Sequence, residues 1–234
     1  MQAPDGMFTF EVLVKGRPVQ EYLHEGITFI EGHRNSEYTL RVHNNARCRA
    51  VAVFSVDGLS VMTGKLASRS DSGYVIGAYG SVEVPGWRLN NDEVAHFFFG
   101  SLPESYASQM DKPQNIGVIG ASIYLEHIPK SLSYHKLGDT LGGGSIRRTR
   151  GMTRGAPSLG TGFGRRTEHQ THEVQFDRED SPAAEMVIRY EDAAALRARG
   201  IDLQGAHKKN DAVLDARPFP GDDHGVPSPP GWRG

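Results

Sequence analysis

The stretch Ser-Glu-Tyr-Thr-Leu-Arg-Val at residues 36–42 alternates strictly between polar and apolar side chains. Its apolar residues, Tyr38, Leu40 and Val42, would face one way and the polar ones the other, as in a strand with one buried face. Asn44-Asn45 follows, and asparagine tolerates the left-handed backbone conformation that turns require. The stretch therefore predicts a β-strand that ends in a turn.

Short segments of the same kind fill residues 7–125. Such short strands at roughly even spacing, separated by turn residues, are typical of antiparallel sandwiches and barrels. No segment of helical period interrupts them, which disfavours parallel β-α-β folds. We predict an all-β, jelly-roll-like antiparallel β-sandwich. Its expected strands are 7–14, 19–24, 27–31, 36–42, 50–56, 74–76, 81–84, 94–99 and 116–125.

Residues 138–166 have a different composition. They contain nine glycines and six arginines against one aspartate, and large apolar residues are sparse. Such a stretch cannot bury enough surface to offset its ordering entropy. We predict a Gly/Arg-rich arm over 131–166 whose arginines contact a partner. These arginines are Arg147, Arg148, Arg150, Arg154, Arg165 and Arg166.

Regular structure is expected to resume after the arm. Residues 172–176 and 185–190 have the pattern of strands, and 191–199 has the composition of a short helix that stops at Gly200. The predicted organisation is a sandwich core (7–130), the arm (131–166), a part that packs back on the sandwich (167–203) and a flexible tail (204–234).

Composition excludes several classes of protein. The net charge is −2 and the pI about 6.6, so whole-chain charge indicates neither a nucleic-acid nor a membrane partner. Cys48 is the single cysteine, which rules out an intrachain disulfide and a cysteine-based metal centre within one chain. The N-terminus lacks the features of a secretory signal, and no apolar run is long enough to cross a membrane. We expect no cofactor, and a virion or a cytoplasmic particle as the location.

His169 and His172 form the best metal-like spacing in the chain, with Glu168 and Glu173 beside them. On a strand, however, an odd separation places the two imidazoles on opposite faces. We favour surface histidines, and a metal-dependent enzyme with these two ligands is the second alternative function.

Two short motifs resemble catalytic signatures without meeting their requirements. Residues 55–60, around Asp57-Gly58, lack the Gly-x-Ser-x-Gly spacing of a nucleophile elbow. We instead expect a turn after a buried strand, with Asp57 bonded to loop amides and holding the loop 57–73. The glycines at 142–144 lack the lysine of a P-loop, and the nearby Arg-Gly pairs lack the aromatic residues that stack on bases. Phosphate contact by this stretch remains a weaker prediction.

Trp87 and Arg88 lie at a predicted strand end, after Pro85-Gly86. We favour a core tryptophan that closes one end of the sandwich. The alternative is an exposed shelf of Trp87 and Arg88 on which a sugar or another surface ligand stacks.

Six strings are distinctive as sequences: FEVLVKGRPV (10–19), SVDGLSV (55–61), DSGYV (71–75), PGWRL (85–89), NIGVIG (115–120) and GTGFG (160–164). With them the chain resembles a group of uncharacterised proteins from bacteria and their phages. The resemblance runs from about residue 8 to 203. It implies a single folded unit and an association with viral structural genes, and it implies no particular activity. It also implies that 160–203 pack on the sandwich, so that the arm lies within one domain.

The leading functional hypothesis is a non-enzymatic structural protein in a repetitive assembly, such as a phage capsid, decoration or tail-associated component. Its expected partners are other protein subunits, including copies of itself. An arm of this length reaches far enough to contact a neighbouring subunit. The first alternative is a β-sandwich module that binds a carbohydrate or another surface ligand through Trp87 and Arg88.

Overall fold

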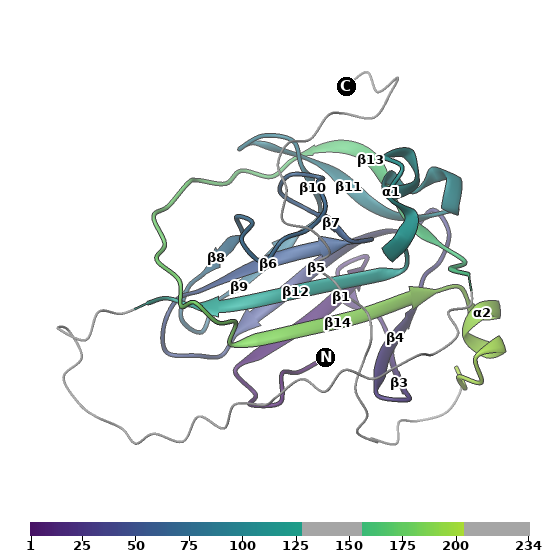
Figure 1. Cartoon of the computed structure of the whole chain (residues 1–234), viewed down its shortest axis with the longest axis horizontal. Helices are drawn as coiled ribbons and strands as arrows, with labels where there is room; N and C mark the ends of the chain where they lie inside the picture. Colours follow the sequence, from purple (N-terminus) through teal and green to yellow (C-terminus); the bar gives the residue numbers. More distant parts are fainter. Residues whose placement is uncertain (128–155, 204–234) are drawn as a thin grey trace.

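Two β-sheets packed face to face form the body of the molecule (Figure 1). The computed structural model describes residues 1–127 and 156–203. One sheet has the order β10-β11-β5-β1-β2, with β13 beside β11 and β9 beside β5, and the other has the order β3-β4-β14-β12-β6-β7, with β8 beside β6. The predicted all-β sandwich is therefore confirmed.

The strands of the first sheet are β1 (Phe8–Val14), β2 (Arg17–Pro18), β5 (Glu37–Asn44), β9 (Ser81–Val84), β10 (Gly86–Arg88), β11 (Glu93–Gly100) and β13 (Gly160–Glu168). Those of the second sheet are β3 (Glu21–His24), β4 (Ile27–Glu31), β6 (Ala50–Val56), β7 (Leu59–Ser60), β8 (Tyr74–Ile76), β12 (Val118–Leu125) and β14 (Ala184–Glu191). The described helical turns are η1 (Leu102–Glu104), α1 (Tyr106–Gln109), η2 (Pro113–Asn115) and α2 (Ala193–Ala198).

The hydrophobic pattern sets which face of each strand is buried. In β5 the burial alternates residue by residue, as its sequence predicts. In β6 every residue is buried, because one face lies in the core between the sheets and Val51 and Val53 on the other face are covered by Phe176. The inner faces meet in one aromatic core, in which Tyr38 stacks on Phe99 and Phe99 packs on Tyr190 of the opposite sheet.

One strand pair departs from an antiparallel arrangement. β14 is antiparallel to β12 and parallel to β4. No tight turn joins β4 to β14, since they are more than 150 residues apart in sequence. Their relative direction is therefore free of the hairpin geometry that makes neighbouring strands antiparallel.

Strand β13 corrects the predicted extent of the arm. The sequence predicts residues 160–166 as part of the arm, but they belong to β13, which pairs with β11 along its length. The glycines of β13, which in the sequence indicate irregular chain, leave room here for neighbouring groups. A Cβ on Gly162 would lie 2.1 Å from the Phe98 ring, so the ring occupies the space that a side chain would fill. The rest of the arm, through 155, and the predicted tail at 204–234 lie outside the described residues.

The part of the chain after β13 also differs from the prediction. The strand expected at 172–176 is wrong, because these residues run without strand pairing and Val174 is 56% exposed. Phe176 alone packs inward, against a small cluster of Val51, Val53 and Tyr124. The predicted helix is present as α2, which Asp192 caps through its side chain and Gly200 follows at φ +83°.

Candidate functional site

A buried polar cluster links the two sheets at one end of the sandwich. It consists of Asp57, Tyr38, Thr161 and Tyr190, and we call it the Asp57 cluster. All four side chains are at most 1% exposed. Tyr38 and Thr161 belong to the first sheet and Tyr190 to the second, while Asp57 directly follows β6.

Asp57 holds its place through an unusual backbone conformation and three incoming hydrogen bonds. Its φ is +53°, in the left-handed region that aspartate tolerates better than most residues. Oδ1 accepts bonds from the Gly117 N–H (2.9 Å) and the Tyr190 hydroxyl (2.6 Å), and Oδ2 accepts one from the Thr161 N–H (2.8 Å). One carboxylate thus joins β13, β14 and the turn before β12.

The hydroxyl groups of the cluster form a chain that points toward this carboxylate. Because the ionised carboxylate only accepts, the Tyr190 hydroxyl must donate to it. Thr161 Oγ1 then donates to the Tyr190 oxygen (2.8 Å), and the Tyr38 hydroxyl donates to Thr161 Oγ1 (2.7 Å). Hydrogen bonds aligned in one direction strengthen each other, so the chain stabilises the buried charge.

Burial governs the acid–base properties of the cluster. It raises the pKa of Asp57 from 3.8 to about 6, and the hydrogen bonds from Tyr190, Thr161 and Gly117 oppose this rise. Burial and then the charge of Asp57 raise the pKa of Tyr38 and that of Tyr190 well above 10.0. At neutral pH the cluster therefore holds one carboxylate and two neutral tyrosines. Its geometry fits a structural tie between the sheets.

Substitution of Tyr190 by phenylalanine tests this tie. The change keeps the ring and removes the hydroxyl that bonds both Asp57 and Thr161. We expect the free energy of unfolding in urea to fall by about 1–2 kcal/mol. Tyr79→Phe is the matched control, because Tyr79 is 68% exposed. Removal of its hydroxyl should change the free energy of unfolding by less than about 0.5 kcal/mol. Equal stability of the two variants would contradict the proposed role of the cluster.

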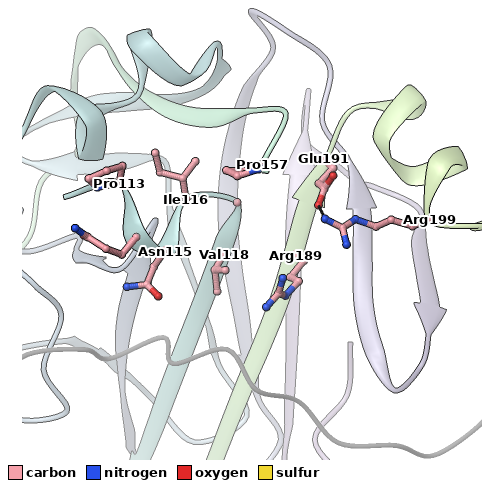
Figure 2. Close-up of a pocket in the computed structure, with 10 residues that line it drawn as sticks. Pro113, Asn115, Ile116, Val118, Pro157, Arg189, Glu191 and Arg199 are labelled. Carbon is pink, nitrogen blue, oxygen red and sulfur yellow. Dashed lines mark ion pairs between the residues drawn. The ribbon is translucent and has the colours of Figure 1, made fainter. Parts of the chain in front are cut away.

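A small pocket lies on the outside of the second sheet, next to the Asp57 cluster (Figure 2). Its volume is about 70 Å³. Gly117 belongs to its wall and also donates its N–H to Asp57. In β14, Tyr190 points into the core, so its neighbours Arg189 and Glu191 point outward to the pocket. The lining residues are Pro113, Gln114, Asn115, Ile116, Gly117, Val118, Pro157, Arg189, Glu191 and Arg199.

An ion pair lies at the pocket wall. Glu191, whose side chain is 6% exposed, binds Arg199 of the α2 C-terminus at 2.5 Å between Oε1 and Nη2. The Arg199 guanidinium also lies over the Phe29 ring, 5.9 Å from its centre. Figure 2 shows the Arg199 side chain extending from α2 back toward Glu191 and β14.

The predicted ligand shelf does not form at Trp87. The indole is 2% exposed, packs on Phe97 and Tyr106, and donates its N–H to the Gly162 carbonyl (3.1 Å). A buried ring offers no face for a ligand to stack on. The tryptophan closes the core, as in the interpretation that the sequence favoured.

Arg88 is engaged within the chain. Its Nε and Nη2 bond the Tyr74 hydroxyl, Nη1 bonds the Asn90 and His169 carbonyls, and Nη2 also contacts His169 Nδ1 at 2.6 Å. These contacts match the five N–H donors of a guanidinium. Arg88 therefore fastens the segment after β13 to the sandwich and has no donor left for a ligand.

The two histidines of the metal hypothesis are not brought together as ligands. His169 accepts from Arg88 at Nδ1 and lies 3.1 Å from the Glu83 carbonyl at Nε2, while His172 is exposed. Burial and the charge of Arg88 lower the pKa of His169. No group of three or more His, Cys, Asp or Glu side chains within residues 1–127 and 156–203 is arranged to hold a metal ion.

Of the six predicted arm arginines, two are described. Arg165 binds Glu37 through two hydrogen bonds (2.8 and 3.1 Å), and Arg166 lies 3.5 Å from a carboxylate oxygen of Glu93. Arg165 therefore reaches β5 across β11, and Arg166 links β13 to its neighbour β11. Arg147, Arg148, Arg150 and Arg154 lie outside the described residues.

The sequence indicated only part of the Asp57 cluster. Asp57 was expected to bond amides of its own loop, but its partners lie 60 to 133 residues away. The sequence predicts Tyr38 and Tyr190 as ordinary strand residues and Thr161 as part of the arm, and nothing in local sequence marks them as hydrogen-bonded to one another. The pocket was missed for the same reason.

Comparison with known proteins does not place the chain in a family. No family model, no curated protein and no solved structure matches it. Among the helices that the structure describes, none has the length and apolar character to cross a membrane.

Proposed function

We propose that the protein is a non-enzymatic structural subunit of a repetitive assembly, and specifically a component of a phage virion. The observation that carries this proposal is how the Arg-rich segment is attached. The segment leaves the sandwich after β12 and returns before β13, so the core holds it at both ends.

The exit from the sandwich is fixed by backbone hydrogen bonds. The Glu126 N–H donates to the Arg49 carbonyl (3.0 Å), and the His127 N–H donates to the Asp177 carbonyl (2.7 Å). The two side chains Arg49 and Glu126 also form an ion pair.

The return to the sandwich is fixed at the opposite end of β12. Leu159 is 4% exposed in the core, and Ser158 Oγ accepts the Asp192 N–H (3.0 Å). Pro157 packs near Gly117, which precedes β12. Eight strand residues at about 3.3 Å each separate the two ends, which gives about 26 Å.

This attachment suits contact between subunits. The segment carries Arg147, Arg148, Arg150 and Arg154, and guanidinium groups bind carboxylates of a neighbouring surface through paired hydrogen bonds. Many copies of one weak contact give a stable array, because each contact raises the effective concentration for the next. The resemblance to phage-associated proteins supports the same interpretation.

Replacing these four arginines by glutamine in the full chain tests the proposal. We expect the weight-average mass from light scattering to rise with concentration for the wild type and to stay near one subunit, 25.6 kDa, for this variant. A matched control replaces four exposed arginines outside the segment, Arg17, Arg34, Arg47 and Arg197, by glutamine and should assemble as the wild type does. A wild type that stays a monomer at high concentration would count against the proposal.

A further inference from the structure

We propose that Arg88 and His169 form a pH-operated latch, which holds the segment after β13 on the sandwich and releases it when His169 takes up a proton. This segment, which we call the strap, comprises residues 169–183 between β13 and β14 (Figure 1). It forms no strand, and its one β-type contact is an isolated bridge between Arg178 and Glu126. Individual side-chain contacts therefore decide how firmly the strap is attached.

The first observation fixes the protonation state of His169. The Arg88 guanidinium can only donate, and its Nη2 lies 2.6 Å from His169 Nδ1, so Nδ1 must accept. The Glu83 carbonyl can only accept, and it lies 3.1 Å from His169 Nε2, so Nε2 must carry the proton. The two partners together select the neutral imidazole with its proton on Nε2.

The second observation concerns the charges around this imidazole. The ionisable residues next to the ring or its backbone are Tyr74 of β8, Glu83 of β9, Arg88 of β10, Asp92 before β11 and His96 of β11. Glu83 and Asp92 contribute only their carbonyl oxygens, and the Glu83 carboxylate lies 3.5 Å from Arg41. No carboxylate among them bonds the ring, so none offsets the repulsion between Arg88 and a protonated His169.

Protonation is incompatible with the latched geometry. A proton on His169 Nδ1 would point at the Nη2–H of Arg88, so the hydrogen bond is lost and two like charges meet. Burial and the charge of Arg88 accordingly lower the pKa of His169 from its ordinary 6.5. A lowered pKa in the latched state means that the latch is at full strength above pH 6.5. It weakens as the pH falls from 6.5 toward the lowered pKa.

The latch acts where the strap has few other attachments. The backbone N–H groups of His169 and Thr171 bond the turn before β11, and the next four residues, 172–175, are exposed. The strap is fastened again at Asp177, whose carbonyl accepts the His127 N–H (2.7 Å). His127 directly precedes the Arg-rich part of the chain, so acidification would act beside that part. This last consequence rests on the proposed function, whereas the latch itself does not.

The experiment follows the histidine ring nitrogens and the backbone amides of the ¹⁵N-labelled full chain by NMR, between about pH 8 and about pH 5. At the upper end we expect His169 to have a protonated Nε2 and an unprotonated Nδ1. We expect its ring to take up a proton only below pH 6.5. The protection of the Thr171 amide against hydrogen exchange, corrected for the intrinsic pH dependence, should then fall about tenfold, as for the loss of one hydrogen bond to a charged group.

Two variants isolate the role of the imidazole. His169→Asn keeps an acceptor oxygen for Arg88 and cannot take up a proton in this range, so the protection of Thr171 should not change with pH. His172→Asn is the matched control, because His172 is an exposed histidine of the same strap, and this variant should behave as the wild type does.

Amide spectra with the wild-type dispersion show that each variant is folded. If His169→Asn does not fold, the wild-type titration decides, since the Thr171 amide must then shift with the same midpoint as the His169 ring. Three results would overturn the proposal: a His169 proton on Nδ1 at neutral pH, a Thr171 protection that is the same at both ends of the pH range, or an equal loss of protection in His169→Asn.

Discussion

Replacing Asp57 by alanine will lower the free energy of unfolding at pH 7 by about 3 kcal/mol. The change leaves the Gly117 N–H, the Thr161 N–H and the Tyr190 hydroxyl without their acceptor, in a site from which water is excluded. Each unpaired buried donor costs about 1–3 kcal/mol, while removal of the buried charge returns part of this cost. Alanine is also strained at φ +53°.

The variant Asp57→Asn separates the effect of removing the buried charge from the effects of lost acceptors and backbone strain. Asparagine keeps the size of the side chain and tolerates the left-handed backbone, and it retains one acceptor oxygen. Its NH₂ group must then face a backbone N–H. We therefore expect a smaller loss of stability than for alanine, measured by urea unfolding monitored by tryptophan fluorescence. If Asp57→Ala were as stable as the wild type, the cluster would not tie the sheets together.

The raised pKa of Asp57 sets the direction in which its contribution to stability changes with pH. Its pKa is 3.8 ordinarily and about 6 in the folded protein. Between these values the unfolded chain loses its proton first, so the contribution of Asp57 to stability falls as the pH rises from about 4 to about 6. The fall is about 3 kcal/mol, from roughly 1.4 kcal/mol per pH unit.

Urea unfolding at several pH values, compared with Asp57→Asn, isolates this effect from that of the histidines. The wild type should exceed the variant in stability by more at pH 4 than at pH 7. A difference that is independent of pH would contradict the assigned titration.

The second large effect is expected for Gly86→Ala. A Cβ at Gly86 would lie 2.0 Å from the Ala95 carbonyl oxygen and 2.9 Å from the His96 Cα, both in the backbone of β11. A backbone neighbour cannot rotate away as a side chain can, so β10 must separate from β11. Overpacking usually costs about 1–3 kcal/mol, and we expect about 3 kcal/mol or more here.

Gly77→Ala is the matched control, since nothing lies within 4 Å of its added Cβ. Its stability should stay within about 0.5 kcal/mol of the wild type. Near-UV circular dichroism should report the displacement of Trp87, the neighbour of Gly86, only in Gly86→Ala. A Gly86→Ala protein as stable as the control would show that the contact between β10 and β11 is looser than described.

Local sequence predicted those strands in which burial leaves a clear hydrophobic pattern. The alternation in β5 and the continuous apolar run of β6 were sufficient, because burial of a strand face leaves a period of two or a solid apolar run. Strand β13 was not predicted, since its glycines indicate irregular chain when their packing partner, the Phe98 ring, is unknown.

The candidate site was less predictable than the fold. Asp57 was correctly expected to accept backbone hydrogen bonds, but which amides it reaches depends on how strands far apart in sequence pair. Trp87 and Arg88 were ambiguous for a similar reason. An aromatic next to an arginine has the same local sequence whether it is buried under Tyr106 or exposed to a ligand.

We propose that the Arg-rich segment contacts neighbouring subunits while the sandwich stays unchanged. Hydrogen–deuterium exchange at low and high protein concentration measures this directly, peptide by peptide. We expect amides of residues 138–155 to exchange more slowly at high concentration, and those of β6 and β12 to exchange at the same rate at both concentrations. Exchange of residues 138–155 that is equally fast at every concentration would contradict it.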